Sequence, residues 1–154
     1  MADCMVLFVC TGNICRSPMA EYMLKNYLGS DTRWLVASAG VAAGRGFHGS
    51  AAAVEELADK GINMTQHESQ PLDKKLVDDA SLIVVMTSSH LAQVCSIFPH
   101  VREKCFLMKS FDRSDKSGDV EDPIGGSAEV YGKVYNEIDS ALPGLTEFMN
   151  HLKG

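Results

Sequence analysis

The sequence contains no apolar stretch long enough to cross a bilayer and no basic leader at its start. Its first apolar run, residues 5–9, ends at a polar turn, far short of the roughly 18 residues that a membrane span requires. A net charge of −6 also argues against a general binder of nucleic acid or of anionic membranes, because both favour a basic surface. We therefore expect a cytoplasmic protein that acts on neither membranes nor nucleic acid.

Cysteines are odd in number, and none forms a CxxC pair or lies at zinc-site spacing from histidines. An odd count without an export signal argues against a disulfide scaffold. The thiols are therefore expected to be reduced, and a special one is to be sought for its reactivity. We expect no metal site and no cofactor. The five cysteines are Cys4, Cys10, Cys15, Cys95 and Cys105.

Short apolar runs alternate with helical patterns along the chain. The apolar runs predict strands at residues 5–9, 34–37, 81–86 and 104–108. Apolar residues at helical spacing predict helices at 17–28, 51–60, 71–79 and 88–98, and a last helix from residue 128 that Pro143 and Gly144 kink or break. This alternation predicts an α/β three-layer sandwich, a four-stranded parallel sheet with helices on both faces, in one domain spanning residues 1–154. Ligands of such folds bind at the carboxyl ends of strands.

The loop after the first predicted strand has the pattern Cys-x5-Arg-Ser, from Cys10 to Ser17. A loop that curls into a helix N-terminus turns its backbone N–H groups inward and forms a cradle for an anion, and the helix dipole favours a thiolate at the same point. Gly12 and Asn13 tolerate the positive φ angles that a tight curl needs. Arg16 can grip two phosphate oxygens, and Ser17 can donate a hydrogen bond to the sulfur. The pattern predicts a nucleophilic Cys10 in a phosphate site.

Attack by a thiolate on a phosphate ester requires a proton for the leaving group, so a carboxylic acid should lie near the cradle. Asp122, followed by Pro123, lies in the long polar stretch 109–127 before the last helix and fits this role. The residues alone do not select it. The local competitors are Asp112, Asp115, Asp119 and Glu121.

At this point the sequence closely resembles the low-molecular-weight protein tyrosine phosphatase family. The resemblance rests on the block VCTGNICRSPMAE at residues 9–21, on Ser38-Ala39-Gly40 and on Asp122-Pro123, in the family's order and over nearly the whole chain. It implies that Cys10 is the nucleophile of a cysteinyl-phosphate mechanism, that Arg16 binds phosphate and that Asp122 is the proton donor. It also implies that the loop backbone completes the phosphate site, at Thr11, Gly12, Asn13, Ile14, Cys15, Arg16 and Ser17.

The same resemblance implies a hydrogen-bond network under the loop, which would hold a strained asparagine in place. Its members are Asn13, Ser17, Ser38 and His67. The resemblance also implies that the protein is a monomer and that its partner is a phosphorylated protein substrate. Inorganic phosphate or sulfate is expected to bind the loop.

The substrate cleft is where the sequence departs from the family. Phe47 matches an aromatic residue that forms one cleft wall, whereas Ile124 stands where the other wall usually carries an aromatic residue. Residues 122–127 also resemble the bacterial protein-arginine phosphatase branch, which carries Thr where this chain has Ile14. Because an apolar residue there suits an aryl phosphate, we expect phosphotyrosine as the substrate, with phosphoarginine as the alternative.

Two other classes of protein explain fewer of these residues. Arsenate reductases share the Cys-x5-Arg loop but need a mobile redox pair, whereas Cys95 and Cys105 fall on a predicted helix and strand. A phosphoprotein-binding module would not need both Cys10 and Asp122. Cys15 is a redox candidate, because a disulfide with Cys10 would protect the nucleophile from over-oxidation.

Overall fold

The computed structural model describes residues 4–31, 33–114 and 118–153. It confirms the predicted parallel sheet, whose four strands lie in the order β2-β1-β3-β4. Because β1 is flanked by β2 on one side and β3 on the other, the chain reverses its direction of winding at the end of β1, where folds of this kind bind ligands. The strands are β1 (Cys4–Cys10), β2 (Trp34–Gly40), β3 (Leu82–Val85) and β4 (Cys105–Leu107).

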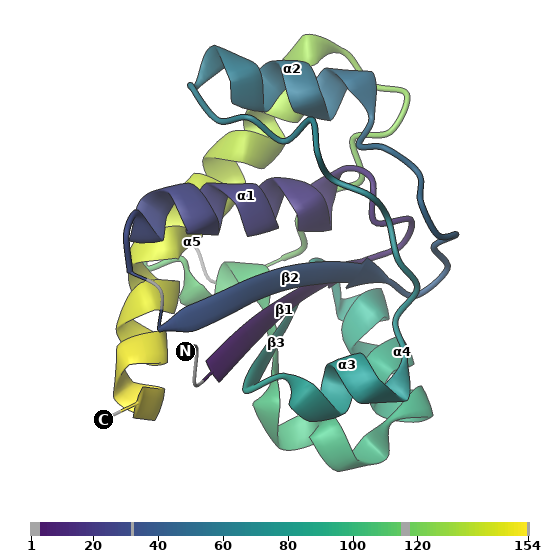
Figure 1. Cartoon of the computed structure of the whole chain (residues 1–154), viewed down its shortest axis with the longest axis vertical. Helices are drawn as coiled ribbons and strands as arrows, with labels where there is room; N and C mark the ends of the chain where they lie inside the picture. The colour runs from purple at the N-terminus through teal and green to yellow at the C-terminus, as the bar shows by residue number, and fades with distance from the viewer. Residues whose placement is uncertain (1–3, 32, 115–117, 154) are drawn as a thin grey trace.

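Helices cover both faces of the sheet, as predicted, and Figure 1 shows the three layers. On one face lie α1 (Arg16–Leu28), α2 (Ala51–Asp59) and α5 (Ala128–Lys153), and on the other lie α3 (Lys74–Asp79) and α4 (Ser88–Ile97). Alternate side chains of β1 enter the two cores. Val6 and Phe8 pack in the core on the α1 side, whereas Leu7 and Val9 pack in the core on the α4 side. All four are fully buried, which explains the unbroken apolar run.

The predicted helix break at Pro143 and Gly144 is wrong at the level of secondary structure, because α5 continues through both residues. Leu142 and Leu145 are buried against the rest of the core, so tertiary packing outweighs the lost backbone hydrogen bond. A side chain at Gly144 would meet the carbonyl oxygen of Phe111 at 2.1 Å, so the glycine allows the helix to approach that backbone closely. Pro143 and Gly144 therefore do not end α5, and Gly144 lets the helix pack closely against the backbone of Phe111.

Several segment boundaries also differ from the prediction, and β2 continues to Gly40 instead of ending at residue 37. The helix expected at 71–79 begins only at Lys74, because the Asp73 side chain accepts a hydrogen bond from the backbone of Leu76 and caps it. The stretch expected as a loop from residue 109 opens with a 3₁₀ turn, η2 (Met108–Phe111). A second 3₁₀ segment, η1 (Pro99–Lys104), precedes β4. None of the helices described is long and apolar enough to span a membrane.

Candidate active site

The loop from Cys10 to Arg16 joins the carboxyl end of β1 to the first turn of α1. Asn13 takes the left-handed conformation, with φ of 57°, and is the only such non-glycine residue in the described part of the chain. The expectation for Gly12 is wrong, because its φ is not positive. The tight curl is therefore made by Asn13, whose short polar side chain can offset the strain with local hydrogen bonds.

The side chain and carbonyl of Asn13 are fully engaged beneath the loop, where the residue is completely buried. The Nδ2 group donates to the hydroxyls of Ser17 at 2.8 Å and Ser38 at 2.9 Å, and Oδ1 accepts from the backbone N–H of Gln70 at 3.0 Å. His67 Nε2 lies 2.7 Å from the Asn13 carbonyl oxygen. The structure thus brings together the four predicted network residues and adds Gln70.

The sulfur of Cys10 lies 2.9 Å from the Ser17 hydroxyl oxygen, and Cys10 itself is almost fully buried. Because the Asn13 amide donates to the Ser17 oxygen, the Ser17 hydroxyl hydrogen can turn to the Cys10 sulfur or to the Ala39 carbonyl oxygen, which lies 3.4 Å away. Ser38 in turn donates to Oε1 of Glu21 at 2.6 Å, so the chain of hydrogen bonds ends on a buried carboxylate. The Ser17 hydroxyl is therefore placed to hydrogen-bond with the Cys10 sulfur from the side of this network.

The neighbouring strand end closes tightly around the loop. A side chain on Gly40 would meet the Thr11 carbonyl oxygen at 2.4 Å, and the backbone of Val41 donates to the Cys10 carbonyl at 2.9 Å. Gly40, the last residue of β2, therefore permits close packing of the backbone against the loop.

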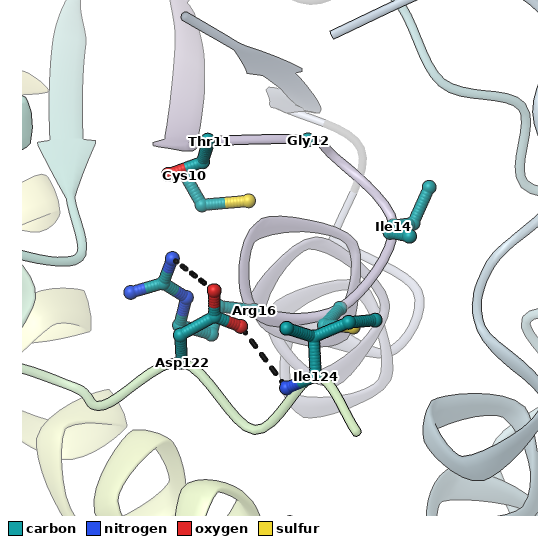
Figure 2. Close-up of a pocket in the computed structure, with 8 residues that line it drawn as sticks. Cys10, Thr11, Gly12, Ile14, Arg16, Asp122 and Ile124 are labelled. Carbon is teal, nitrogen blue, oxygen red and sulfur yellow. Dashed lines mark hydrogen bonds and ion pairs between the residues drawn. The ribbon is translucent and has the colours of Figure 1, made fainter. Parts of the chain in front are cut away.

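Arg16 is held beneath the cavity by the long segment that precedes α5 (Figure 2). Its Nη1 donates to the Val120 carbonyl at 3.0 Å, and its Nη2 lies 3.8 Å from Oδ2 of Asp122. Asp122 is oriented by a hydrogen bond from the Ile124 backbone to Oδ1, at 3.1 Å. The Arg16 side chain is 5% exposed and that of Asp122 is 50% exposed, so the guanidinium is fixed while the carboxylate stands at the rim.

The competing acids have other surroundings. Asp112 is buried and accepts hydrogen bonds from Ser114, and Asp119 accepts from the Ser88 backbone at 2.8 Å. Glu121 is exposed beside Lys133, and Asp115 lies outside the described residues. Among the described competitors and Asp122, only Asp122 lines the cavity above Cys10.

That cavity has a volume of about 190 Å³ and contains the reactive groups together with two apolar walls. Ile14 and Ile124 line it, as predicted, whereas Phe47 does not. The Phe47 side chain is 62% exposed and stacks over Gly44, where an added side chain would meet the ring at 2.5 Å. The lining residues are Cys10, Thr11, Gly12, Ile14, Cys15, Arg16, Asp122 and Ile124.

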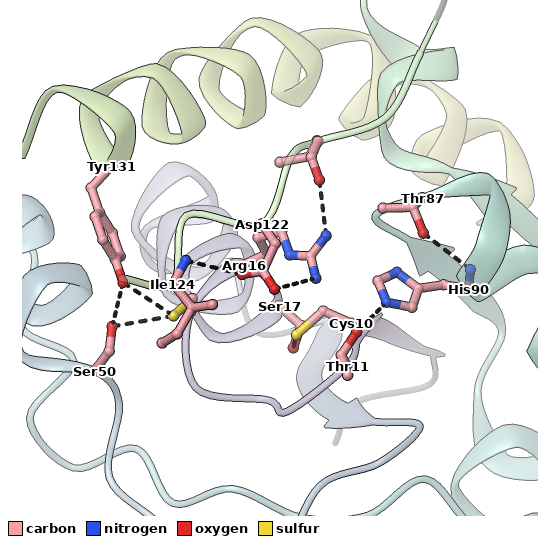
Figure 3. Close-up of polar contacts among 12 residues, drawn as sticks. Cys10, Thr11, Arg16, Ser17, Ser50, Thr87, His90, Asp122, Ile124 and Tyr131 are labelled. Carbon is pink, nitrogen blue, oxygen red and sulfur yellow. Dashed lines mark hydrogen bonds and ion pairs between the residues drawn. The ribbon is translucent and has the colours of Figure 1, made fainter. Parts of the chain in front are cut away.

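Cys15 is buried, and its sulfur contacts two hydroxyl groups. The sequence did not predict either contact. The Cys15 sulfur lies 3.2 Å from Ser50 Oγ and 3.4 Å from the Tyr131 hydroxyl (Figure 3). Burial raises the pKa of the Cys15 thiol, although the two hydrogen bonds act in the opposite direction. Ser50 and Tyr131 are distant in sequence, and no local pattern could have indicated this contact.

These features together allow one kind of chemistry. The cavity brings the buried Arg16 guanidinium and the Cys10 sulfur together where the loop enters a helix N-terminus, an arrangement that suits an anion such as phosphate. Fold and site therefore define the class as a cysteine-dependent phosphoric monoester hydrolase.

Comparison with known proteins narrows the class to a family. The model of the low molecular weight phosphotyrosine protein phosphatases matches residues 5–153, and the chain belongs to this family. The chain is 40% identical to a protein-arginine-phosphatase of Geobacillus stearothermophilus, over 92% of this chain and 93% of that protein.

Two solved structures show the same fold. The low molecular weight protein tyrosine phosphatase from T. tengcongensis is 40% identical, with a TM-score of 0.85 over 94% of this chain and 99% of that chain. The tyrosine phosphatase Wzb from Escherichia coli K30, in complex with sulphate, is 32% identical, with a TM-score of 0.84 over 97% and 99% of the two chains.

Proposed function

We propose that this protein hydrolyses phosphotyrosine in proteins through a cysteinyl-phosphate intermediate. The observation that carries the proposal is that Cys10, Arg16 and Asp122 line one cavity, with Ser17 hydrogen-bonded to the Cys10 sulfur. Nucleophile, phosphate anchor and acid are thus within reach of a single phosphate group.

In the first step, the Cys10 thiolate attacks phosphorus, and an S–P bond forms as the P–O bond to the tyrosyl oxygen breaks. The departing oxygen takes a proton from Asp122, which stands at the exposed rim of the cavity. The backbone N–H groups of Thr11–Ser17 and the Arg16 guanidinium hold the remaining phosphate oxygens and stabilise their charge in the transition state.

In the second step, water attacks the phosphocysteine from the side of the cavity that the leaving group has left. The carboxylate of Asp122, now deprotonated, takes a proton from that water, so inorganic phosphate forms and the S–P bond breaks. Ser17 donates its hydrogen bond to the departing thiolate. The sulphate in the Escherichia coli K30 relative supports the expectation that free phosphate or sulphate binds this loop.

The choice of substrate follows from the apolar lining of the cavity. Ile14 and Ile124 present hydrocarbon to whatever group carries the phosphate, which suits an aromatic ring better than a charged guanidinium. The 40% identical relative named a protein-arginine-phosphatase favours phosphoarginine as the second candidate. The equally similar T. tengcongensis enzyme, described as a tyrosine phosphatase, favours the first.

Hydrolysis of matched phosphotyrosine and phosphoarginine peptides by the wild type and by Ile14→Thr tests this choice. We expect the wild type to prefer phosphotyrosine and Ile14→Thr to shift kcat/KM toward phosphoarginine. Ile97→Thr makes the same change as a control, because Ile97 is exposed on α4 and lies outside the cavity lining. A wild-type preference for phosphoarginine would overturn the assignment. The single domain, the monomeric state and the cytoplasmic location stay predictions.

A further inference from the structure

His90 is a buried histidine that the mechanism above does not use. It is 3% exposed and lies on the first turn of α4, outside the residues that line the cavity. Its Nε2 lies 2.8 Å from the hydroxyl oxygen of Thr11, the residue that follows Cys10 (Figure 3). Thr11 does line the cavity, so this contact connects a second element of the fold to the phosphate loop.

The position of His90 is fixed by its own helix. Thr87 caps α4 by accepting a hydrogen bond from the His90 backbone at 3.1 Å, and α4 starts just after β3, which pairs with β1 through Val9 and Val85. The ring therefore approaches Thr11 from the helix that follows β3, the strand next to β1. A histidine whose backbone and ring are both anchored can set the orientation of a neighbouring hydroxyl.

The surroundings also fix the protonation of the ring. Burial, together with the nearby charge of Arg16, lowers the pKa of His90 to about 4, so the imidazole is neutral and carries one proton. Its Nδ1 atom is buried and has no hydrogen-bond partner within the described residues. A proton on Nδ1 would bury an unpaired N–H group, whereas a proton on Nε2 is paired with the Thr11 oxygen.

We infer that His90 is a positioning residue whose Nε2–H donates to Thr11 Oγ1 and so leaves the hydroxyl hydrogen of Thr11 free for a phosphate oxygen in the cavity. Thr11 would then bind phosphate with its side chain as well as with its backbone. The inference rests on the proposed function for the nature of the ligand, but it concerns binding of the phosphate group and not the chemical steps.

The α4 N-terminus also contacts the segment that carries the acid. The Ser88 backbone donates to Asp119 at 2.8 Å, and the Val120 backbone donates to the Met86 carbonyl at 2.8 Å. A loss of His90 could therefore act through Asp122 instead of Thr11. The two routes differ in their kinetics, because a misplaced acid slows poor leaving groups most, whereas a weakened phosphate site slows all substrates alike.

The experiment titrates inorganic phosphate into the wild type, His90→Leu, His90→Gln, Thr11→Val and the His90→Leu/Thr11→Val double variant, by calorimetry. We expect His90→Leu and Thr11→Val each to weaken phosphate binding about fivefold, which is the size of one lost hydrogen bond. His90→Gln, whose amide can donate from a similar place, should stay within about twofold of the wild type. The double variant should bind no more weakly than Thr11→Val, because both changes remove one interaction.

Turnover of aryl phosphates with good and poor leaving groups completes the test, and we expect His90→Leu to lower kcat/KM by the same factor for both. A loss that grows for poor leaving groups, or single losses that multiply in the double variant, would overturn the inference. So would wild-type phosphate affinity in a folded His90→Leu. If His90→Leu does not fold, the nitrogen NMR spectrum of wild-type His90 decides, since an unprotonated Nε2 contradicts the assignment. A wild type that binds phosphate but hydrolyses nothing would count against the proposed function alone.

Discussion

The carboxylate of Asp122 lies 3.8 Å from the guanidinium of Arg16, and the two side chains differ tenfold in exposure, 50% against 5%. At that distance and exposure, the ion pair contributes little to stability. Its geometry instead places a fixed positive charge at the cavity floor and an accessible acid at its rim. Figure 2 shows the Arg16 guanidinium and the Asp122 carboxylate side by side, facing the side chain of Cys10.

Asp122→Asn should therefore lower kcat/KM by about 10²–10⁴ for aryl phosphates with poor leaving groups and far less for those with good ones, because only the former need a proton in the first step. Steady-state rates over a series of leaving groups measure this. Glu121→Gln is the matched control, since Glu121 is adjacent in sequence but 71% exposed beside Lys133. Equal losses across the series would remove Asp122 from the role of general acid.

Gly40→Ala should destabilise the protein by about 1–3 kcal/mol, because the new methyl group would meet the Thr11 carbonyl at 2.4 Å. The phosphate loop is one side of that contact, so activity should fall with stability. Urea unfolding and turnover measure the two effects.

The control for Gly40→Ala is Gly132→Ala, in α5. There the nearest atom to the added methyl group is Glu56 Oε1 at 3.7 Å, and alanine favours a helix interior by roughly 1 kcal/mol. We expect no destabilisation from it. If both variants lose stability equally, the close approach at Gly40 does not matter.

Local sequence was enough to predict the phosphate loop and the strands. The loop lies within one strand–helix connection. Because β1 is buried on both faces, its sequence is an unbroken apolar run. The same locality explains why Cys10 and Arg16 could be proposed together from their spacing. Asp122 needed the family resemblance, because several acids share its segment and only the fold shows which one faces the cavity.

What sequence could not show depends on contacts between distant segments. Gln70 and Tyr131 reach the loop from 57 and 116 residues away, from Asn13 and Cys15 respectively. His90 had one usable signal, its place just after a buried strand, where parallel sheets gather functional groups. The predicted break at Pro143 was wrong because Leu142 and Leu145 hold α5 against distant parts of the core, which the local sequence does not show.

The stability of the wild type should fall as the pH drops from about 6.5 to about 4, in part through His90. The unfolded state binds a proton on this residue near pH 6.5, whereas burial and Arg16 keep the folded-state pKa at about 4, so acid favours unfolding. The charges of Asp119 and Asp122 act against this shift, because they raise the pKa of His90. Across this pH window, protonation of His90 should lower the free energy of unfolding by on the order of 2–3 kcal/mol.

Urea unfolding of the wild type and His90→Gln between about pH 4 and pH 7 isolates this effect, since the variant should lack that part of the slope. His151→Gln serves as the control, because His151 is exposed near the end of α5. Identical pH slopes in the wild type and His90→Gln would contradict a neutral, buried His90.

Peroxide should inactivate the wild type reversibly, with thiols restoring activity, whereas Cys15→Ala should recover much less. A disulfide between Cys10 and Cys15 would protect the nucleophile from irreversible oxidation, and it requires the Cys15 sulfur to leave Ser50 and Tyr131. Recovered activity after reduction measures this. Cys4→Ala is the control at the far end of β1, and equal recovery in Cys15→Ala would rule out the protective pair.

The central claim is that phosphate is transferred to Cys10. It is tested most directly by mixing the protein with a phosphotyrosine peptide, quenching within the first turnover and locating the phosphate by mass spectrometry. With an aryl phosphate whose leaving group needs no proton, Asp122→Asn should accumulate the intermediate, because the base for its hydrolysis is missing. We predict phosphate on the peptide that contains Cys10, and neither phosphate nor turnover in Cys10→Ala. Phosphate on another residue, or turnover that survives Cys10→Ala, would contradict the account.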